Sequence, residues 1–170
     1  MTILYSIIFS FLNFGKSDLP ITQYLQIADS TKVEIVDFEG LKPIFEDKSD
    51  QVYIINFWAT WCKPCVKELP YFEQIHDEYK NEEVKVILVS LDFPKQIESK
   101  LIPFLEKHQL KSNVVVLDDS NSNVWINAVD PSWTGAIPAT VVYKADKRQF
   151  FEKNFVSFEE LNNIIKSYLN

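Results

Sequence analysis

Two segments of the chain are almost continuously apolar, and each predicts a strand that is buried on both faces. They are Val52–Trp58 (VYIINFW) and Val84–Ser90 (VKVILVS), both rich in β-branched and aromatic residues. Further strands are predicted at shorter apolar runs, namely Val33–Val36, Val114–Leu117 and a hairpin of Ala139–Tyr143 with Gln149–Lys153 across Ala145–Arg148.

Apolar residues three to four positions apart predict three helices. The first carries Val66, Leu69, Phe72, Ile75 and Tyr79 on one face. Pro70 lies inside this pattern and is expected to kink the helix. The second helix is predicted over Gln96–His108.

The third helix has the strongest start signal. Ser157 and Glu160 form an S-x-x-E capping box, and apolar residues at helical spacing follow it. Two segments are less regular: Phe38–Asp47 is predicted to be a short helix or loop, and Asp118–Gly135 a polar irregular stretch.

The order of these elements predicts an α/β fold. Strands that alternate with helices form parallel crossovers, and the late hairpin adds an antiparallel edge. We therefore expect one domain, built on a central mixed β-sheet flanked by helices, because 170 residues suffice for one ordinary domain.

Composition narrows the functional classes. The net charge is −7 and no basic stripe is visible, which disfavours nucleic acid as a partner. The chain has three glycines, and neither a G-x-G-x-x-G pattern nor a P-loop occurs. Hydrophobic residues make up 46% and charged residues 24%, which is typical of a soluble globular protein.

The first residues form a separate segment. From Ile3 to Phe14 nine of twelve residues are apolar, which is too short to span a membrane and resembles the apolar region of a signal peptide. No Lys or Arg precedes this run and no A-x-A-like cleavage site follows, so the alternative is a segment that packs on the domain. We divide the chain into residues 1–17 (apolar segment), 18–32 (linker) and 33–170 (domain).

The chain has two cysteines, Cys62 and Cys65, placed where a buried strand gives way to a helix. At a helix N-terminus, free N–H groups and the helix dipole favour a thiolate, the attacking species in disulfide exchange. Two alternatives remain. A zinc site would need four ligands, and only His76 and His108 could add to the cysteines. A purely structural disulfide would constrain little of the unfolded chain.

Position predicts the role of each residue in the motif. Cys62, at the exposed end, is expected to be the nucleophile that forms a mixed disulfide, and Cys65, one turn deeper, to resolve it. Pro64 suits an early helix position. Lys63 adds a positive charge that is expected to stabilise the thiolate and make the couple more oxidising.

The segment Phe57–Pro70 (FWATWCKPCVKELP) resembles the active-site segment of the TlpA/ResA branch of thioredoxin-like proteins, which are bacterial envelope thiol–disulfide oxidoreductases. The order of elements and Gly135–Thr140 (GAIPAT) match as well, so the resemblance covers Val33 to Asn170. It implies a thioredoxin fold with an N-terminal extension and an insertion, about Leu91 to Ser132, before the cis-proline hairpin.

The resemblance also implies roles for single residues. Pro138 matches the cis-proline that faces the cysteines, so the backbone of Ile137 could hydrogen-bond an extended substrate. Glu68 matches an acidic residue that could accept a proton from Cys65. Asn56 stands where thioredoxins carry a buried acid, which leaves proton handling to Glu68 or water. The surface that contacts substrate is expected to include Trp61, Lys63, Pro64, Ile137 and Pro138.

The expected function is a reductant of protein disulfides in the bacterial envelope or periplasm, a monomer without cofactor or metal that a membrane thiol donor re-reduces. One alternative is a general thioredoxin in the cytoplasm, against which Asn56 and the apolar segment argue. Another is a redox-inactive binding module. A further alternative is a thiol peroxidase, which usually has a Thr three residues before its reactive Cys. Here Thr60 is two residues before Cys62, and this spacing argues against a peroxidase.

Overall fold

The structure is a computed structural model that describes residues 33–80 and 83–169. The predicted apolar segment 1–17 and the linker 18–32 lie outside the described residues. Within the described ranges, no helix combines the length and the apolar character that crossing a membrane requires.

Six strands form one mixed sheet in the order β1-β4-β3-β2-β5-β6. The first four of these strands run parallel to one another, whereas β5 runs antiparallel to its neighbours β2 and β6. This confirms the predicted parallel crossovers and antiparallel edge. The strands are β1 (Glu34–Val36), β2 (Val52–Trp58), β3 (Val84–Ser90), β4 (Asn113–Leu117), β5 (Ala139–Lys144) and β6 (Lys147–Phe151).

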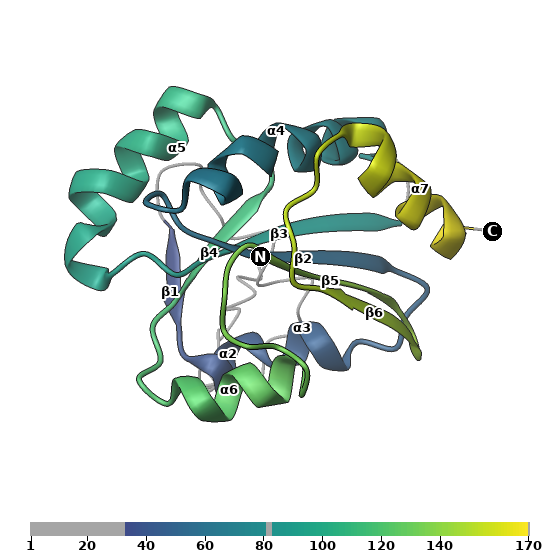
Figure 1. The fold of residues 1–170 in the computed structure, drawn as a ribbon, viewed down its shortest axis with the longest axis horizontal. Coiled ribbons are helices and arrows are strands. Elements are labelled where there is room, and N and C mark those ends of the chain that lie inside the picture. Colours follow the sequence, from purple (N-terminus) through teal and green to yellow (C-terminus); the bar gives the residue numbers. More distant parts are fainter. Residues whose placement is uncertain (1–32, 81–82, 170) are drawn as a thin grey trace, which may run out of the picture.

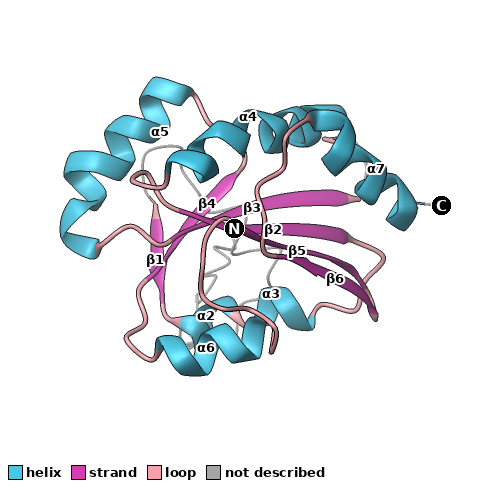
Figure 2. Cartoon of the chain, viewed as in Figure 1, coloured by secondary structure: helices cyan, strands magenta, loops and turns pink. Residues whose placement is uncertain are grey.

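Helices cover both faces of the sheet (Figure 1 and Figure 2). One face carries α4 (Lys63–Glu78), α5 (Ile102–His108) and α7 (Phe158–Leu169). The other carries α2 (Phe38–Leu41), α3 (Pro43–Glu46) and α6 (Ser122–Val129). A 3₁₀ turn and a π-helical turn, Pro94–Gln96 and Ile97–Leu101, lead into α5, so the predicted helix Gln96–His108 is helical in three successive geometries.

Strand β2 lies at the centre of the fold because it contributes to both hydrophobic cores. All seven of its residues are buried, and alternate side chains enter opposite cores. Ile54 and Trp58 join the core under α4 and α7, while Ile55 and Phe57 join the core under α2 and α6. The continuous apolar pattern of this segment therefore predicted its position correctly.

Two local predictions were wrong. Residues 122–129, expected to be irregular, form α6, whose Trp125 and Val129 are four residues apart and buried against the sheet. The hairpin turn is also tighter than predicted: Lys144 pairs with Lys147, so β6 begins two residues earlier than Gln149. Ala145 adopts a positive φ of 51° in this two-residue turn.

The predicted start of α7 is present with one change. The Ser157 hydroxyl oxygen accepts from the Glu160 N–H at 3.2 Å, as in a capping box. The Glu160 carboxylate, however, accepts from the N–H of Val156 at 2.9 Å, one residue before Ser157. Glu160 thus makes two contacts: its backbone N–H takes part in the helix cap, and its carboxylate binds the segment before the helix.

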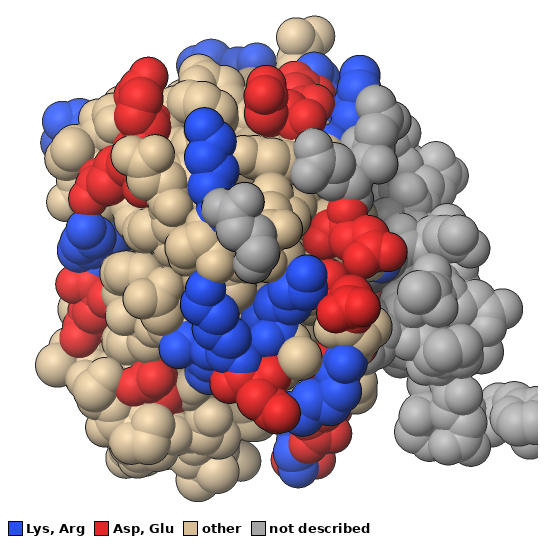
Figure 3. All heavy atoms as spheres, turned by 90° about the vertical axis from the view of Figure 1, so that its right-hand side faces the viewer, with Lys and Arg blue, Asp and Glu red and all other residues tan. Residues whose placement is uncertain are grey.

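Charged side chains of both signs are spread over the surface. On the face shown in Figure 3, basic side chains lie next to acidic ones. Ion pairs join Lys111 to Asp77 at 2.7 Å and Lys48 to Asp146 at 2.7 Å. Such exposed pairs contribute little to stability individually, so the two hydrophobic cores carry most of it.

Candidate active site around Cys62 and Cys65

The cysteine pair lies where β2 ends and α4 begins. Cys62 is the N-cap residue of α4, and its sulfur accepts from the Cys65 N–H at 3.3 Å. The two cysteines form a disulfide with their Cα atoms 5.3 Å apart. Cys62 is 6% exposed and Cys65 is fully buried. The outer sulfur is therefore the one that a partner can reach, which supports the roles expected from position.

The loop before β5 brings a backbone carbonyl to the outer sulfur. The Ile137–Pro138 peptide bond is cis, and the Ile137 carbonyl oxygen lies 3.7 Å from the Cys62 Sγ. The loop is fixed from two sides. The Trp133 indole N–H donates to the Ala136 carbonyl at 2.8 Å, and the Glu152 carboxylate accepts from the N–H groups of Thr134 and Ala136 at 3.2 and 3.1 Å.

A buried carboxylate holds the loop between β2 and α4. Asp92, 1% exposed, accepts from the Thr60 N–H at 2.9 Å and from the Thr60 hydroxyl at 2.5 Å. It also accepts from the Ser90 hydroxyl at 2.9 Å. These three hydrogen bonds tie the residues just before Cys62 to the carboxyl end of β3, and so fix the path of the chain into α4.

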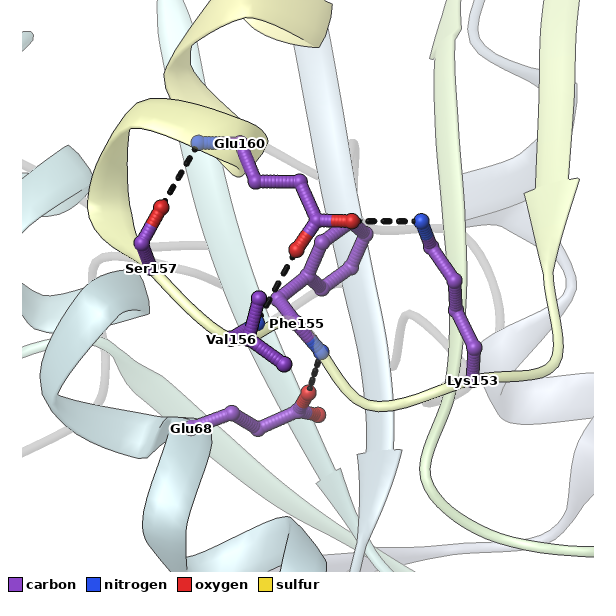
Figure 4. Close-up of polar contacts among 6 residues, drawn as sticks. All are labelled: Glu68, Lys153, Phe155, Val156, Ser157 and Glu160. Atoms are coloured by element: carbon purple, nitrogen blue, oxygen red, sulfur yellow. Dashed lines mark hydrogen bonds and ion pairs between the residues drawn. The ribbon is translucent and has the colours of Figure 1, made fainter.

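Glu68 lies one turn after Cys65 on α4 and is fully buried. Its Oε1 accepts from the Asn56 side-chain N–H at 2.9 Å, and its Oε2 accepts from the backbone N–H of Phe155 at 2.7 Å. Figure 4 shows the segment that supplies the second donor: Lys153 and Val156 both contact Glu160, which pins this segment to α7. The acid is thus held between β2 and the chain entering α7.

Burial raises the pKa of Glu68 from its ordinary value near 4.5 to about 7. The N–H donors of Phe155 and Asn56 oppose this shift, and the negative charge of Glu160 adds to it. A carboxyl group with a pKa near neutral can both take up and release a proton at physiological pH. This is the property that proton transfer with a neighbouring thiol requires.

We expect the raised pKa of Glu68 to appear in the stability of the oxidised protein. Between pH 4.5 and 7 the native state keeps a proton that the unfolded chain releases, so stability falls as pH rises through this window. Relative to Glu68→Gln, the free energy of unfolding of the wild type should fall on the order of 3 kcal/mol across it. Urea unfolding of both proteins from pH 4 to 8 measures this difference, and a constant difference would contradict it.

The remaining predicted residues lie on the surface around the sulfurs. Trp61 is 54% exposed, and Lys63 and Pro64 are also exposed. Trp58, by contrast, is a core residue whose ring packs on Phe104 with centroids 5.4 Å apart. Within residues 33–80 and 83–169, no three His, Cys, Asp or Glu side chains group closely enough to hold a metal ion.

Sequence reasoning missed two supporting residues, Asp92 and Glu152. A signal for Asp92 was available, because it follows a buried parallel strand and the carboxyl ends of such strands meet at one edge of the sheet. Glu152 had no comparable signal. Its contacts with Thr134 and Ala136 depend on the register of the β5–β6 hairpin.

Comparison with known proteins agrees with this geometry. The AhpC/TSA family model matches residues 28–148. The thiol-disulfide oxidoreductase ResA of a Bacillus cereus strain is 34% identical over 82 residues, which are 48% of this chain and 46% of that protein. The chain thus matches curated relatives such as this one over about half of their length.

Solved structures share the fold. A thioredoxin-related protein from Neisseria meningitidis serogroup B is 26% identical with a TM-score of 0.61, over 74% of this chain and 89% of that one. A secreted Mycobacterium tuberculosis disulfide oxidoreductase has a TM-score of 0.55 at 20% identity, over 75% and 86% of the two chains. The predicted thioredoxin fold is confirmed, and the chain belongs to the AhpC/TSA family.

Proposed function

We propose that this protein is a thiol–disulfide oxidoreductase whose redox centre is the Cys62–Cys65 pair. One observation carries the proposal: the outer sulfur of a disulfide at a helix N-terminus lies 3.7 Å from the carbonyl oxygen of Ile137. An extended substrate that pairs with the backbone of residue 137 would bring its own sulfur next to Cys62. The substrates are accordingly disulfides and thiols of other proteins.

The reaction follows from the order of burial. The Cys62 thiolate attacks a substrate disulfide, forms a mixed disulfide and releases the first substrate sulfur as a thiolate, which water protonates. Cys65 then transfers its proton to Glu68 and attacks Cys62, which releases the second substrate sulfur. The substrate gains two electrons and the Cys62–Cys65 pair loses two. The proton on Glu68 passes to the released thiolate or to solvent.

We further propose that the protein acts as a reductant in the bacterial envelope, as a monomer that a membrane thiol donor re-reduces. The apolar segment Ile3–Phe14 supports export. The pairing of Asn56 with Glu68 supports the envelope branch rather than cytosolic thioredoxins, in which a buried acid occupies the strand position.

The reduction potential of the Cys62–Cys65 pair tests the proposal. The full chain is equilibrated in graded dithiothreitol or glutathione buffers, and its free thiols are counted. CxxC proteins span about −270 to −120 mV. A reversible two-electron couple near the negative end is the expected result. A value near the positive end would reverse the proposed direction of electron flow. Absence of a couple, or rapid consumption of hydrogen peroxide instead of disulfides, would overturn the function itself.

A further inference from the structure

A buried polar cluster behind the cysteines is arranged asymmetrically. Asn56, Glu68 and Thr140 are all fully buried. The Asn56 Nδ2 donates both of its hydrogens, to Glu68 Oε1 at 2.9 Å and to Thr140 Oγ1 at 3.0 Å. The Asn56 Oδ1, on the other side of the same amide, is buried without a hydrogen-bond partner. A buried carbonyl oxygen is rarely left in this state, so its surroundings call for an explanation.

The two oxygens of Glu68 are not equivalent as places for a proton. Oε2 faces the backbone N–H of Phe155 at 2.7 Å, and an N–H group can only donate. A protonated Oε2 would be a weaker acceptor for that N–H, and the N–H group offers no acceptor for the added proton. A proton taken up by Glu68 therefore belongs on Oε1, the oxygen that faces Asn56. With the amide as it stands, that proton would point at the Nδ2 group, which is also a donor.

A half-turn of the Asn56 amide removes this conflict. The nitrogen and oxygen of an amide are nearly the same size, so the turn places Oδ1 where Nδ2 now lies, next to Glu68 Oε1 and Thr140 Oγ1. Oδ1 would then accept from the protonated Oε1 and from the Thr140 hydroxyl, which can donate as well as accept. The amide NH₂ would then lie where Oδ1 lies now, a position without a hydrogen-bond partner. Either orientation of the amide therefore leaves one of its ends unpaired: Oδ1 beside the carboxylate, and the NH₂ group beside the carboxylic acid.

The charged groups around Glu68 do not provide another place for the proton. Glu160 lies beyond the Phe155–Val156 backbone and is paired with Lys153 at 2.6 Å. Cys65 lies on the same helix as Glu68 and is the source of the proton in the proposed reaction. From β2, Glu68 is contacted by the neutral side chain of Asn56, whose amide also donates to the neutral Thr140 of β5.

We propose that Asn56 is a positioning residue that follows the protonation state of Glu68: its amide donates to the carboxylate and, turned over, accepts from the carboxylic acid. The proposal deepens the proposed function, on which it rests for the source of the proton. The proposal explains why an amide suits this position. An aspartate here would place a second negative charge beside Glu68, and an apolar residue could hydrogen-bond neither the charged nor the protonated form of Glu68.

Nuclear magnetic resonance of the oxidised full chain tests this inference, because no cysteine titrates in that form. We expect the Asn56 side-chain NH₂ signals and the Glu68 carboxyl signal to titrate with one common midpoint between pH 5 and 9. Cross-relaxation between the NH₂ group and the Thr140 methyl group should be present at high pH and fall at least threefold at low pH. Unchanged cross-relaxation on both sides of the titration would overturn the proposal.

Glu68→Gln is the matched control, since its side chain is neutral at every pH. In this variant the Asn56 NH₂ signals should lose their dependence on pH, and a titration that persists would assign the effect to another group and contradict the proposal. The experiment needs no substrate. Its outcome is therefore independent of the redox titration that tests the function, and failure of one leaves the other standing.

Discussion

Replacing Cys62 with serine is expected to lower the rate of disulfide reduction by more than about 10³-fold, to the background of the assay. A serine hydroxyl group is almost entirely protonated at neutral pH. The helix N-terminus, which favours a thiolate at this position, therefore cannot turn it into an effective nucleophile. The reduced full chain, mixed with a disulfide substrate in single-turnover conditions, measures this loss. Activity within tenfold of the wild type would show that Cys62 is not the nucleophile.

Cys65→Ser is the matched variant, because it removes the buried sulfur and keeps the outer one. It should attack the substrate normally and then stop at the mixed disulfide, since no second thiol can release the product. Mass spectrometry of the trapped complex should place the substrate on Cys62. If Cys65→Ser turned over and Cys62→Ser formed the trapped complex, the two roles would be reversed.

Asp92→Ala is expected to have the largest effect on stability, a loss of about 4 kcal/mol in the free energy of unfolding of the oxidised protein. The substitution leaves the Thr60 N–H, the Thr60 hydroxyl and the Ser90 hydroxyl without the acceptor that now takes all three. Hydrogen bonds to a charged group contribute about 1.5 to 3 kcal/mol each, and buried donors without partners are costly. Urea unfolding at pH 7 measures the loss.

Asp118→Ala provides the comparison for Asp92. Asp118 also follows a parallel strand, β4, but its side chain is exposed. Its removal should change stability by less than about 0.5 kcal/mol. Asp92→Asn keeps one acceptor oxygen and should fall between the two. A loss of under 1 kcal/mol for Asp92→Ala would mean that solvent replaces the carboxylate, and that the loop before Cys62 does not depend on it.

The parts of the fold that could be predicted from sequence are those with strong local patterns. β2 and β3 are almost continuous apolar runs, α4 begins within the cysteine motif, and α7 has a capping residue at its start. In each case the secondary structure that the local sequence favours is the one that the packing of the whole fold requires. The cysteine pair could be placed at a helix N-terminus for the same reason.

The parts that could not be predicted depend on contacts distant in sequence. No side-chain cap marks the start of α6. The helix is held by Trp125 and Val129, which pack against the sheet in the core that β2 also enters. The two hydrogen bonds on Glu68 join α4 to β2 and to the segment before α7. Helical spacing placed Glu68 near Cys65, but only the assembled fold shows which groups set the pKa of its carboxyl.

The long sequence separations within the site have a consequence for synthesis on the ribosome. The contacts of Cys62 with Ile137, Asn56 with Thr140 and Glu68 with Phe155 span 75, 84 and 87 residues. Strand β2 also gains its second neighbour only with β5. A nascent chain therefore displays its thiols, and one open side of its central strand, well before the residues that enclose them exist. Oxidation or misassembly of the newborn chain is most to be expected during this interval.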